Sequence, residues 1–120
     1  MADALDLSTF APTGVDDLAS GIFSQLAGLL VGKLKRFRQE YRSYVEDVSR
    51  ATIAVANQLK DGLYDVRQAD LALHAQEFLI SSAILRAEFL TYELVQSVLE
   101  TIFTVLRAAI RNLTGVDLRF

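Results

Sequence analysis

The amino-acid sequence predicts an all-α protein, in which two long helices form an antiparallel, coiled-coil-like helical hairpin with short extended tails. Apolar residues recur at alternating steps of three and four over most of the chain, which is the period of a helix that packs along one stripe. The only proline is Pro12, and no strand pattern follows it until the last residues. A single glycine, Gly62, divides the periodic region into two segments of similar length.

The first predicted helix covers residues 15–60. Its start is indicated by Thr13-Gly14-Val15-Asp16, which has the pattern of a capping box, and by Asp17, a second acid in the positive first turn. Its heptad seam consists of Leu30, Leu34, Phe37, Tyr41, Tyr44, Val48, Ala51 and Val55. The helix is expected to end at Gly62, because glycine readily adopts the left-handed conformation that terminates many helices.

The second predicted helix covers residues 64–113. An aspartate of the preceding turn, Asp61 or Asp65, is expected to cap its start, and Gly115 is expected to follow its end. A short turn that contains glycine favours an antiparallel hairpin. The alternative is one nearly continuous helix, since Gly62 inside a helix would cost only about 1 kcal/mol.

The two ends of the chain differ from the helical region. We therefore divide the sequence into an N-terminal extended arm, 1–13, the helical hairpin, 14–114, and a C-terminal tail, 115–120. Residues 5–10 and 116–120 are apolar at alternating positions. They are expected either to pair as a short two-stranded ribbon or to fray, as chain ends often do.

The composition limits the classes of protein to consider. Hydrophobic residues make up 52% of the chain, which favours burial of the excess against a partner. The net charge of −3 argues against a dedicated nucleic-acid binder. The acidic start does not resemble a signal peptide. The longest uncharged run, 18–32, is shorter than the roughly 20 apolar residues of a membrane-spanning helix. The localisation is left open, because a chain without cysteine fits either redox compartment.

The region 94–113 carries an apolar surface that spreads over about 180° of the helix, whereas one contact stripe needs only about 100°. One partner helix cannot cover such an arc, so we expect a homo-oligomer held through this face. The self-association residues expected there are Val95, Val98, Ile102, Val105, Leu106 and Ala109. The alternative is that the helix 15–60 folds back in two pieces and covers both sides within one chain.

Small residues recur every four positions in the first helix. Ser20, Ser24, Gly28 and Gly32 form this stripe, which is typical of a close helix–helix contact. An alternative is a membrane-surface segment, 15–38, whose apolar residues would insert into a bilayer. These inserting residues would be Ile22, Phe23, Leu26, Leu29 and Leu30. The stripe is also consistent with an ordinary helix that glycine weakens locally.

A cluster of bases follows this stripe. It consists of Lys33, Lys35, Arg36, Arg38 and Arg42. Such a cluster is a candidate anion or membrane contact. It is also typical of a solvated or intersubunit salt-bridge face, since Arg36–Glu40 and Arg42–Glu46 stand four residues apart. Nucleic acid is an unlikely partner on the overall charge.

Catalytic chemistry is not expected. The only histidine, His74, shares a helical face with Asp70 and Glu77, but helical metal sites normally draw ligands from several helices. No glycine-rich phosphate loop follows a strand. The sequence therefore indicates no catalytic residue, no metal, no cofactor and no small-molecule substrate.

One short segment resembles a known pattern. Tyr92-Glu93-Leu94-Val95 is similar to the Ala-Tyr-x-x-Ile/Val-Met segment in the helical subunits of flagellar rod junctions and of type III secretion rods and needles. Thr91 and Gln96 replace the alanine and the methionine, and the helix continues well beyond the segment. The chain also resembles small helical virion proteins in size and helicity. We assign no family on this basis.

The expected function is that of a non-enzymatic structural subunit of a homo-oligomeric helical complex, for example a virion or secretion-apparatus component. The alternatives are a peripheral membrane-binding protein and a helical adaptor for another protein.

Overall fold

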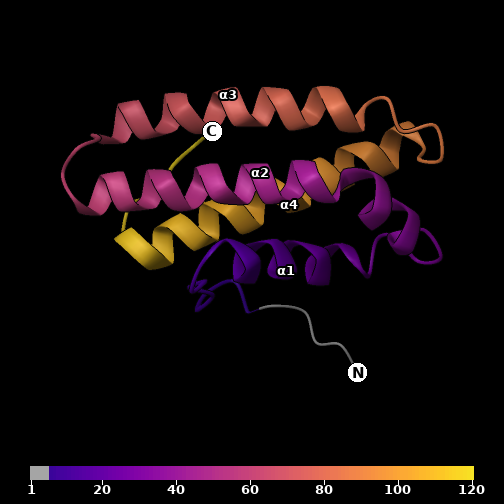
Figure 1. Cartoon of the computed structure of the whole chain (residues 1–120), viewed down its shortest axis with the longest axis horizontal. Coiled ribbons are helices and arrows are strands. Elements are labelled where there is room, and N and C mark those ends of the chain that lie inside the picture. The colour runs from indigo at the N-terminus through magenta and orange to yellow at the C-terminus, as the bar shows by residue number, and fades with distance from the viewer. Residues whose placement is uncertain (1–5) are drawn as a thin grey trace.

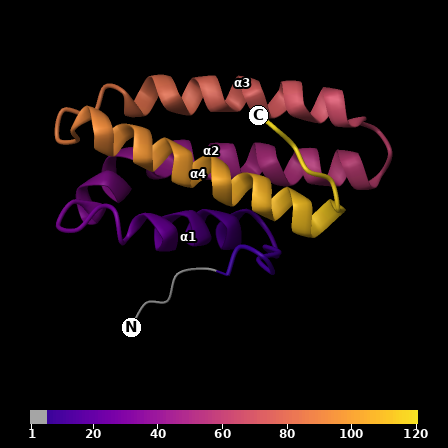
Figure 2. The same cartoon turned by 180° about the vertical axis from the view of Figure 1, so that it is seen from behind.

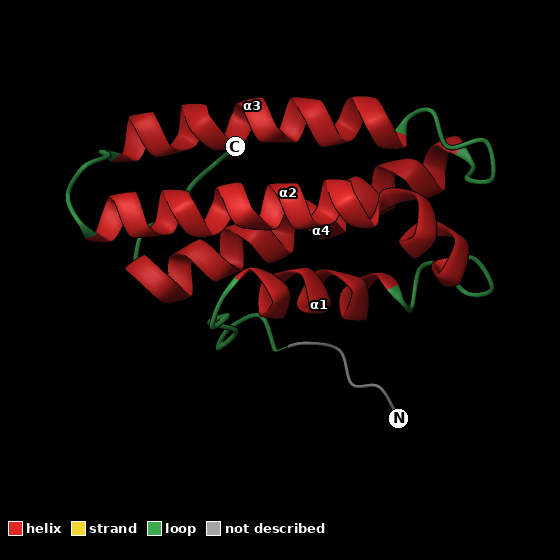
Figure 3. Cartoon of the chain, in the orientation of Figure 1, coloured by secondary structure: helices red, strands yellow, loops and turns green. Residues whose placement is uncertain are grey.

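The computed structural model describes residues 6–120 and contains four helices (Figure 1). They are α1 (Val15–Leu26), α2 (Leu34–Lys60), α3 (Val66–Ile84) and α4 (Tyr92–Thr114). No strand occurs between residues 6 and 120, as the colouring of Figure 3 shows, so the prediction of an all-α protein is confirmed. The prediction of two long helices is wrong, because each of them is divided into two shorter helices.

The first predicted helix is interrupted at residues 27–33. Gly32 has a φ of 77°, a left-handed conformation that an α-helix cannot contain and that glycine adopts without strain. Leu30 lies within this turn and is fully buried. The turn therefore reverses the chain, and α2 runs back antiparallel to α1 (Figure 1).

The second predicted helix is interrupted at residues 85–91, a segment without glycine or proline. Two of its side chains, Ala87 and Leu90, are buried in the core. Thr91 then begins α4 as its N-cap, with its hydroxyl oxygen accepting a hydrogen bond of 3.1 Å from the Leu94 amide. Burial of Ala87 and Leu90 against other helices thus outweighs the tendency of this segment to continue as a helix.

The predicted turn between the two halves of the chain is present. Gly62 has a φ of 74°, as expected for the residue that ends α2. Asp65 caps α3 in a capping box, in which its side chain accepts the Gln68 amide and its own amide donates to the Gln68 side chain. Gly115, with a φ of 78°, ends α4 as predicted.

Consecutive helices run antiparallel, and α2 and α4 lie at the centre of the molecule (Figures 1 and 2). α1 packs against both central helices, whereas α3 packs mainly against α2 and only slightly against α4. α1 and α3 do not contact each other and form opposite edges. The molecule measures 42 × 31 × 21 Å.

The core forms where both central helices turn their apolar faces inward. Its largest fully buried side chains come from every helix and from the turn after α1. They are Leu18, Ile22, Leu26, Leu30, Phe37, Val45, Leu73, Ile84, Val98, Ile102, Leu106 and Ile110. α1 and α2 contact α4 from different sides, so the region 15–60 covers the wide apolar surface of α4 in two pieces within one chain.

Both tails are held against α4 in the described residues, so they form neither the ribbon nor the frayed ends that the sequence suggested. The Leu7 carbonyl oxygen accepts hydrogen bonds from the side chains of Arg111 (3.0 Å) and Asn112 (2.9 Å). At the other end Phe120 is buried, and Arg107 donates to its carbonyl oxygen at 2.7 Å. The first part of the expected arm, 1–5, lies outside the described residues.

One buried polar group on α2 predicts a stabilising substitution. The Ser49 hydroxyl is fully buried without a hydrogen-bond partner among the described residues. We expect Ser49→Ala to raise the free energy of unfolding by about 1 kcal/mol, because it removes an unsatisfied polar group. A thermal melt followed by circular dichroism should show a midpoint roughly 4 °C higher.

Thr52 provides the matched control for this substitution. It is equally buried, but its hydroxyl donates a hydrogen bond of 2.7 Å to the Val48 carbonyl oxygen. Thr52→Ala should therefore lower the melting midpoint. A fall of similar size for Ser49→Ala would contradict the prediction.

Candidate functional site

The α3 helix is apolar on two opposite faces. The inner face packs on α2 through Ala69, Leu73, Ile80 and Ile84, all of which are buried. A helix that packs on one neighbour needs only one such stripe, and its other face is normally polar. The outer face of α3 is the exception in this molecule.

Large apolar residues of the outer face recur every seven residues. We name as the α3 seam the set Leu71, Ala75, Phe78, Ser82 and Leu85, in which Ser82 is the one polar member and Leu85 directly follows the helix. Exposed fractions are 61% for Leu71, 70% for Phe78 and 54% for Leu85. This spacing is that of a helix packed along a second helix, and no helix of the described chain covers it.

A row of charged side chains borders one flank of the α3 seam. His74 Nδ1 lies 3.3 Å from Glu77 Oε1, and the Asp70 carboxylate accepts a hydrogen bond of 2.9 Å from the Arg119 amide. The exposed Arg67 side chain has no salt-bridge or hydrogen-bond partner within residues 6–120. Arg67, Asp70 and His74 also line a cavity of about 490 Å³ with the C-terminal tail.

The sequence contained a signal for the α3 seam. Steps of four and three connect the residues from Leu71 to Leu85, but the same segment also carries the inner stripe from Ala69 to Ile84. Two overlapping stripes give weak overall periodicity. Only the position of α3 at the edge of the bundle shows which stripe is covered.

The six residues expected to mediate self-association are buried within the chain. Val95 is 3% exposed, and Val98, Ile102, Val105, Leu106 and Ala109 are fully buried. The premise that one chain cannot cover this face is therefore wrong, because α1 and α2 cover it from different sides. These side chains are not available as a contact surface in this structure.

The small-residue stripe does not form a close helix contact in the structure. Ser20, Ser24, Gly28 and Gly32 are all exposed. Gly28 and Gly32 lie beyond the end of α1, so the regular spacing does not continue as a helical stripe. A Cβ atom added at either glycine would meet nothing within 4 Å.

The residues expected to insert into a membrane are mostly in the core. Ile22, Phe23, Leu26 and Leu30 are buried, and Leu29 is the exception. The region 15–38 cannot lie flat on a bilayer with these side chains inserted while this fold is intact. Within residues 6–120 no helix combines the length and the apolar composition needed to cross a membrane.

Three of the five clustered bases have partners in the chain. Arg36 forms a salt bridge of 2.7 Å with Glu40, and Arg42 one of 3.1 Å with Glu46. The Arg38 guanidinium lies 4.7 Å from the centre of the Phe23 ring. No such partner exists among the described residues for the side chains of Lys33 and Lys35. The cluster is thus partly a salt-bridged helix face, as one of the two interpretations predicted.

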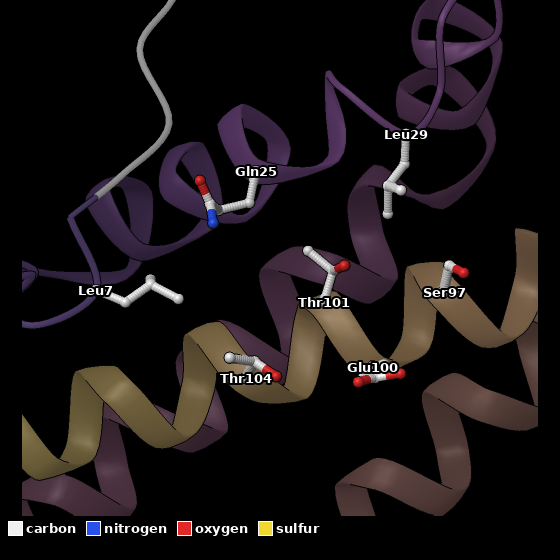
Figure 4. A pocket seen from close by; sticks show the side chains of 7 residues that line it. All are labelled: Leu7, Gln25, Leu29, Ser97, Glu100, Thr101 and Thr104. Carbon is white, nitrogen blue, oxygen red and sulfur yellow. The ribbon is translucent and has the colours of Figure 1, made fainter.

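A groove between α1 and α4 is lined mainly by polar side chains (Figure 4). It has a volume of about 310 Å³. Its lining consists of Leu7, Gln25, Leu29, Ser97, Glu100, Thr101 and Thr104. Glu100 is the only charged group of this lining, so the groove holds no acid–base pair. Elsewhere in the described residues, no cluster of three His, Asp or Glu side chains could hold a metal ion.

Within residues 6–120 two ionisable groups have a displaced pKa, and neither lies on α3. Hydrogen bonds from the side chain and the amide of Ser8 lower the pKa of the Asp6 carboxyl below its usual value. Burial, with a smaller contribution from the charge of Glu40, raises the pKa of the Tyr41 hydroxyl. Both shifts have local causes and mark no cleft.

No family model, no curated protein and no solved structure matches this chain. The geometry of its own residues is therefore the basis for a function.

An aspartate introduced on the buried face of α4 should destabilise the fold far more than one introduced on the exposed face of α3. Ile102→Asp places a carboxylate in the core and should lower the free energy of unfolding by more than about 3 kcal/mol. Phe78→Asp lies on the exposed face and should change it by less than about 0.5 kcal/mol in dilute solution. Urea titration followed by circular dichroism measures both. A stable, monomeric Ile102→Asp variant would contradict the burial of this residue.

Proposed function

We propose that the protein is a non-enzymatic structural subunit that self-associates through the outer face of α3. The single observation that carries this proposal is the α3 seam, in which large apolar side chains at heptad spacing are left uncovered. Burial of each such side chain would contribute about 1.5–3 kcal/mol, which favours contact with a second helix. The surface proposed is thus on α3 rather than on α4.

The charges beside the α3 seam support a second copy of this chain as the partner. Along one flank the order is Arg67, Asp70, His74 and Glu77, so basic and acidic groups alternate. In an antiparallel two-fold contact this row lies against the same row of the second copy in reverse order. Each basic side chain then faces an acidic one. With the axis near residue 72, Arg67 of each copy lies opposite Glu77 of the other.

The apolar residues are compatible with this arrangement. Leu71 lies next to the two-fold axis and would contact its own counterpart. Phe78 would reach the start of α3 in the second copy, where Val66 is exposed and Leu63 is exposed in the preceding turn. The register that pairs the charges therefore brings Leu71 and Phe78 of the α3 seam into the contact, whereas Leu85 lies beyond the start of α3 in the second copy.

The setting that we propose for this subunit is a larger helical assembly, such as a virion or a secretion apparatus. This proposal rests on the small size and the high helical content of the chain, and both remain when the long helices are divided. The alternative is a helical adaptor, in which the same seam binds a helix of another protein. A purified chain that self-associates supports the structural subunit, and one that stays monomeric supports the adaptor.

The first test removes the largest exposed side chain of the seam. Light scattering after size exclusion should show a dimer for the wild-type chain and a 13.3 kDa monomer for Phe78→Asp. Tyr92→Asp is the matched control, because Tyr92 has the same exposed fraction of 70% but lies on α4. A wild-type chain that stays monomeric at high concentration would overturn self-association and favour the adaptor.

The second test exchanges the charges of the proposed pair. Arg67→Glu and Glu77→Arg alone should each weaken the dimer roughly 5–30-fold, because two symmetric pairs change from attraction to repulsion at up to about 1 kcal/mol each. The double variant should restore the affinity to near the wild-type value, because the exchanged charges attract each other again across the contact. The two residues are too far apart on α3 to pair within one chain, so a rescue would report a contact between two copies. Analytical ultracentrifugation measures the dissociation constants. A double variant weaker than both single variants would show that the register is wrong.

A further inference from the structure

The turn between α1 and α2 presents an apolar tip at one end of the bundle. Figures 1 and 2 both place this turn, residues 27–33, at the same end as the loop 85–91. Val31 at its apex is 80% exposed, more than any other large apolar side chain of the described residues. Leu29 is only 37% exposed and faces the groove between α1 and α4 (Figure 4), so Val31 is the apolar side chain that this turn presents.

The backbone holds Val31 outward. Leu30, the preceding residue, is fully buried, and its carbonyl oxygen accepts hydrogen bonds from the amides of Lys33 (2.8 Å) and Leu34 (2.9 Å). Gly32, the following residue, has the left-handed conformation that closes the turn. Val31 cannot turn into the core unless Leu30 leaves it, so its exposure is a fixed property of this turn.

Two lysines next to this tip have no side-chain partner in the part of the chain that the structure describes. Lys33 and Lys35 lack the carboxylate or aromatic partners that Arg36, Arg38 and Arg42 have within residues 6–120. Both lysines stand at the start of α2, where a positive charge is unfavourable for the helix itself. A negatively charged partner outside the chain would compensate this arrangement.

We propose that this turn binds the surface of an anionic lipid bilayer. Val31 enters the boundary between headgroups and acyl chains, and Lys33 and Lys35 contact the lipid phosphates. A nucleic-acid backbone would attract the lysines but offers no apolar layer for Val31. This contact is made by the end of the folded bundle, in contrast to the flat helix that the sequence suggested.

The neighbouring loop adds little to this surface. Leu85 and Tyr92 are exposed at the same end, but the exposed carboxylates of Glu88 and Glu93 flank them. These acids would be repelled by anionic lipid, so binding is centred on the α1–α2 turn. The surface is separate from the α3 seam and does not depend on self-association. Copies paired antiparallel through α3 carry their turns at opposite ends, so one flat bilayer contacts one turn.

The test is co-sedimentation of the full chain with vesicles at low ionic strength. Vesicles that contain phosphatidylglycerol should bind the protein, and vesicles of pure phosphatidylcholine should not. Lys33→Glu combined with Lys35→Glu should weaken binding at least tenfold, since each lysine near such a surface contributes roughly fivefold. Val31→Asp should weaken binding about as strongly.

Leu63→Asp is the matched control. Leu63 is 67% exposed in the turn between α2 and α3, at the opposite end of the bundle, and its substitution should leave vesicle binding unchanged. Phe78→Asp should also bind normally, which separates this inference from the function proposed above. Circular dichroism of each variant checks that the fold is kept.

Three results would overturn the inference. The first is no binding to anionic vesicles at low salt. The second is loss of binding for Leu63→Asp equal to that for Val31→Asp. The third is binding to a DNA duplex that is as strong as vesicle binding and insensitive to Val31→Asp, which would assign the lysines to a polyanion instead of a bilayer.

Discussion

The burial of one wide apolar surface on α4 determines how the other helices are placed. This surface is too broad for a single partner helix, and its centre, around Ile102 and Leu106, is fully buried. The first half of the chain is divided by the turn at Gly32, so that α1 and α2 contact α4 from different sides. A straight helix over residues 15–60 would have left one side of α4 in water.

The position of α3 follows from the same constraint. Once α1 and α2 have taken the sides of α4, α3 packs mainly on α2 and forms an edge of the molecule. Its inner stripe is satisfied there, and its outer stripe, with Leu71 and Phe78, is not. The uncovered apolar area of the protein therefore lies on α3 and not on α4, where the sequence predicted it.

The two ends of the bundle also differ because of where the chain reverses. The turn after α1 combines a buried anchor, Leu30, with an exposed apex, Val31, and is followed by Lys33 and Lys35, whose side chains have no partner within residues 6–120. The turn after α2 is bordered by Asp61 and Asp65, and the second of these is used as a helix cap. The first of these turns is thus flanked by lysines and the second by aspartates.

The helical content, the turn at Gly62 and the end of α4 at Gly115 could be predicted from the sequence. These features depend on local properties: the period of the apolar residues, capping side chains and the left-handed conformation of glycine. The turns at 27–33 and 85–91 instead depend on the tertiary structure, because burial of residues against distant helices stabilises them. It also decided that Ile102 is inside and Phe78 outside, since in the sequence each belongs to an equally regular apolar stripe.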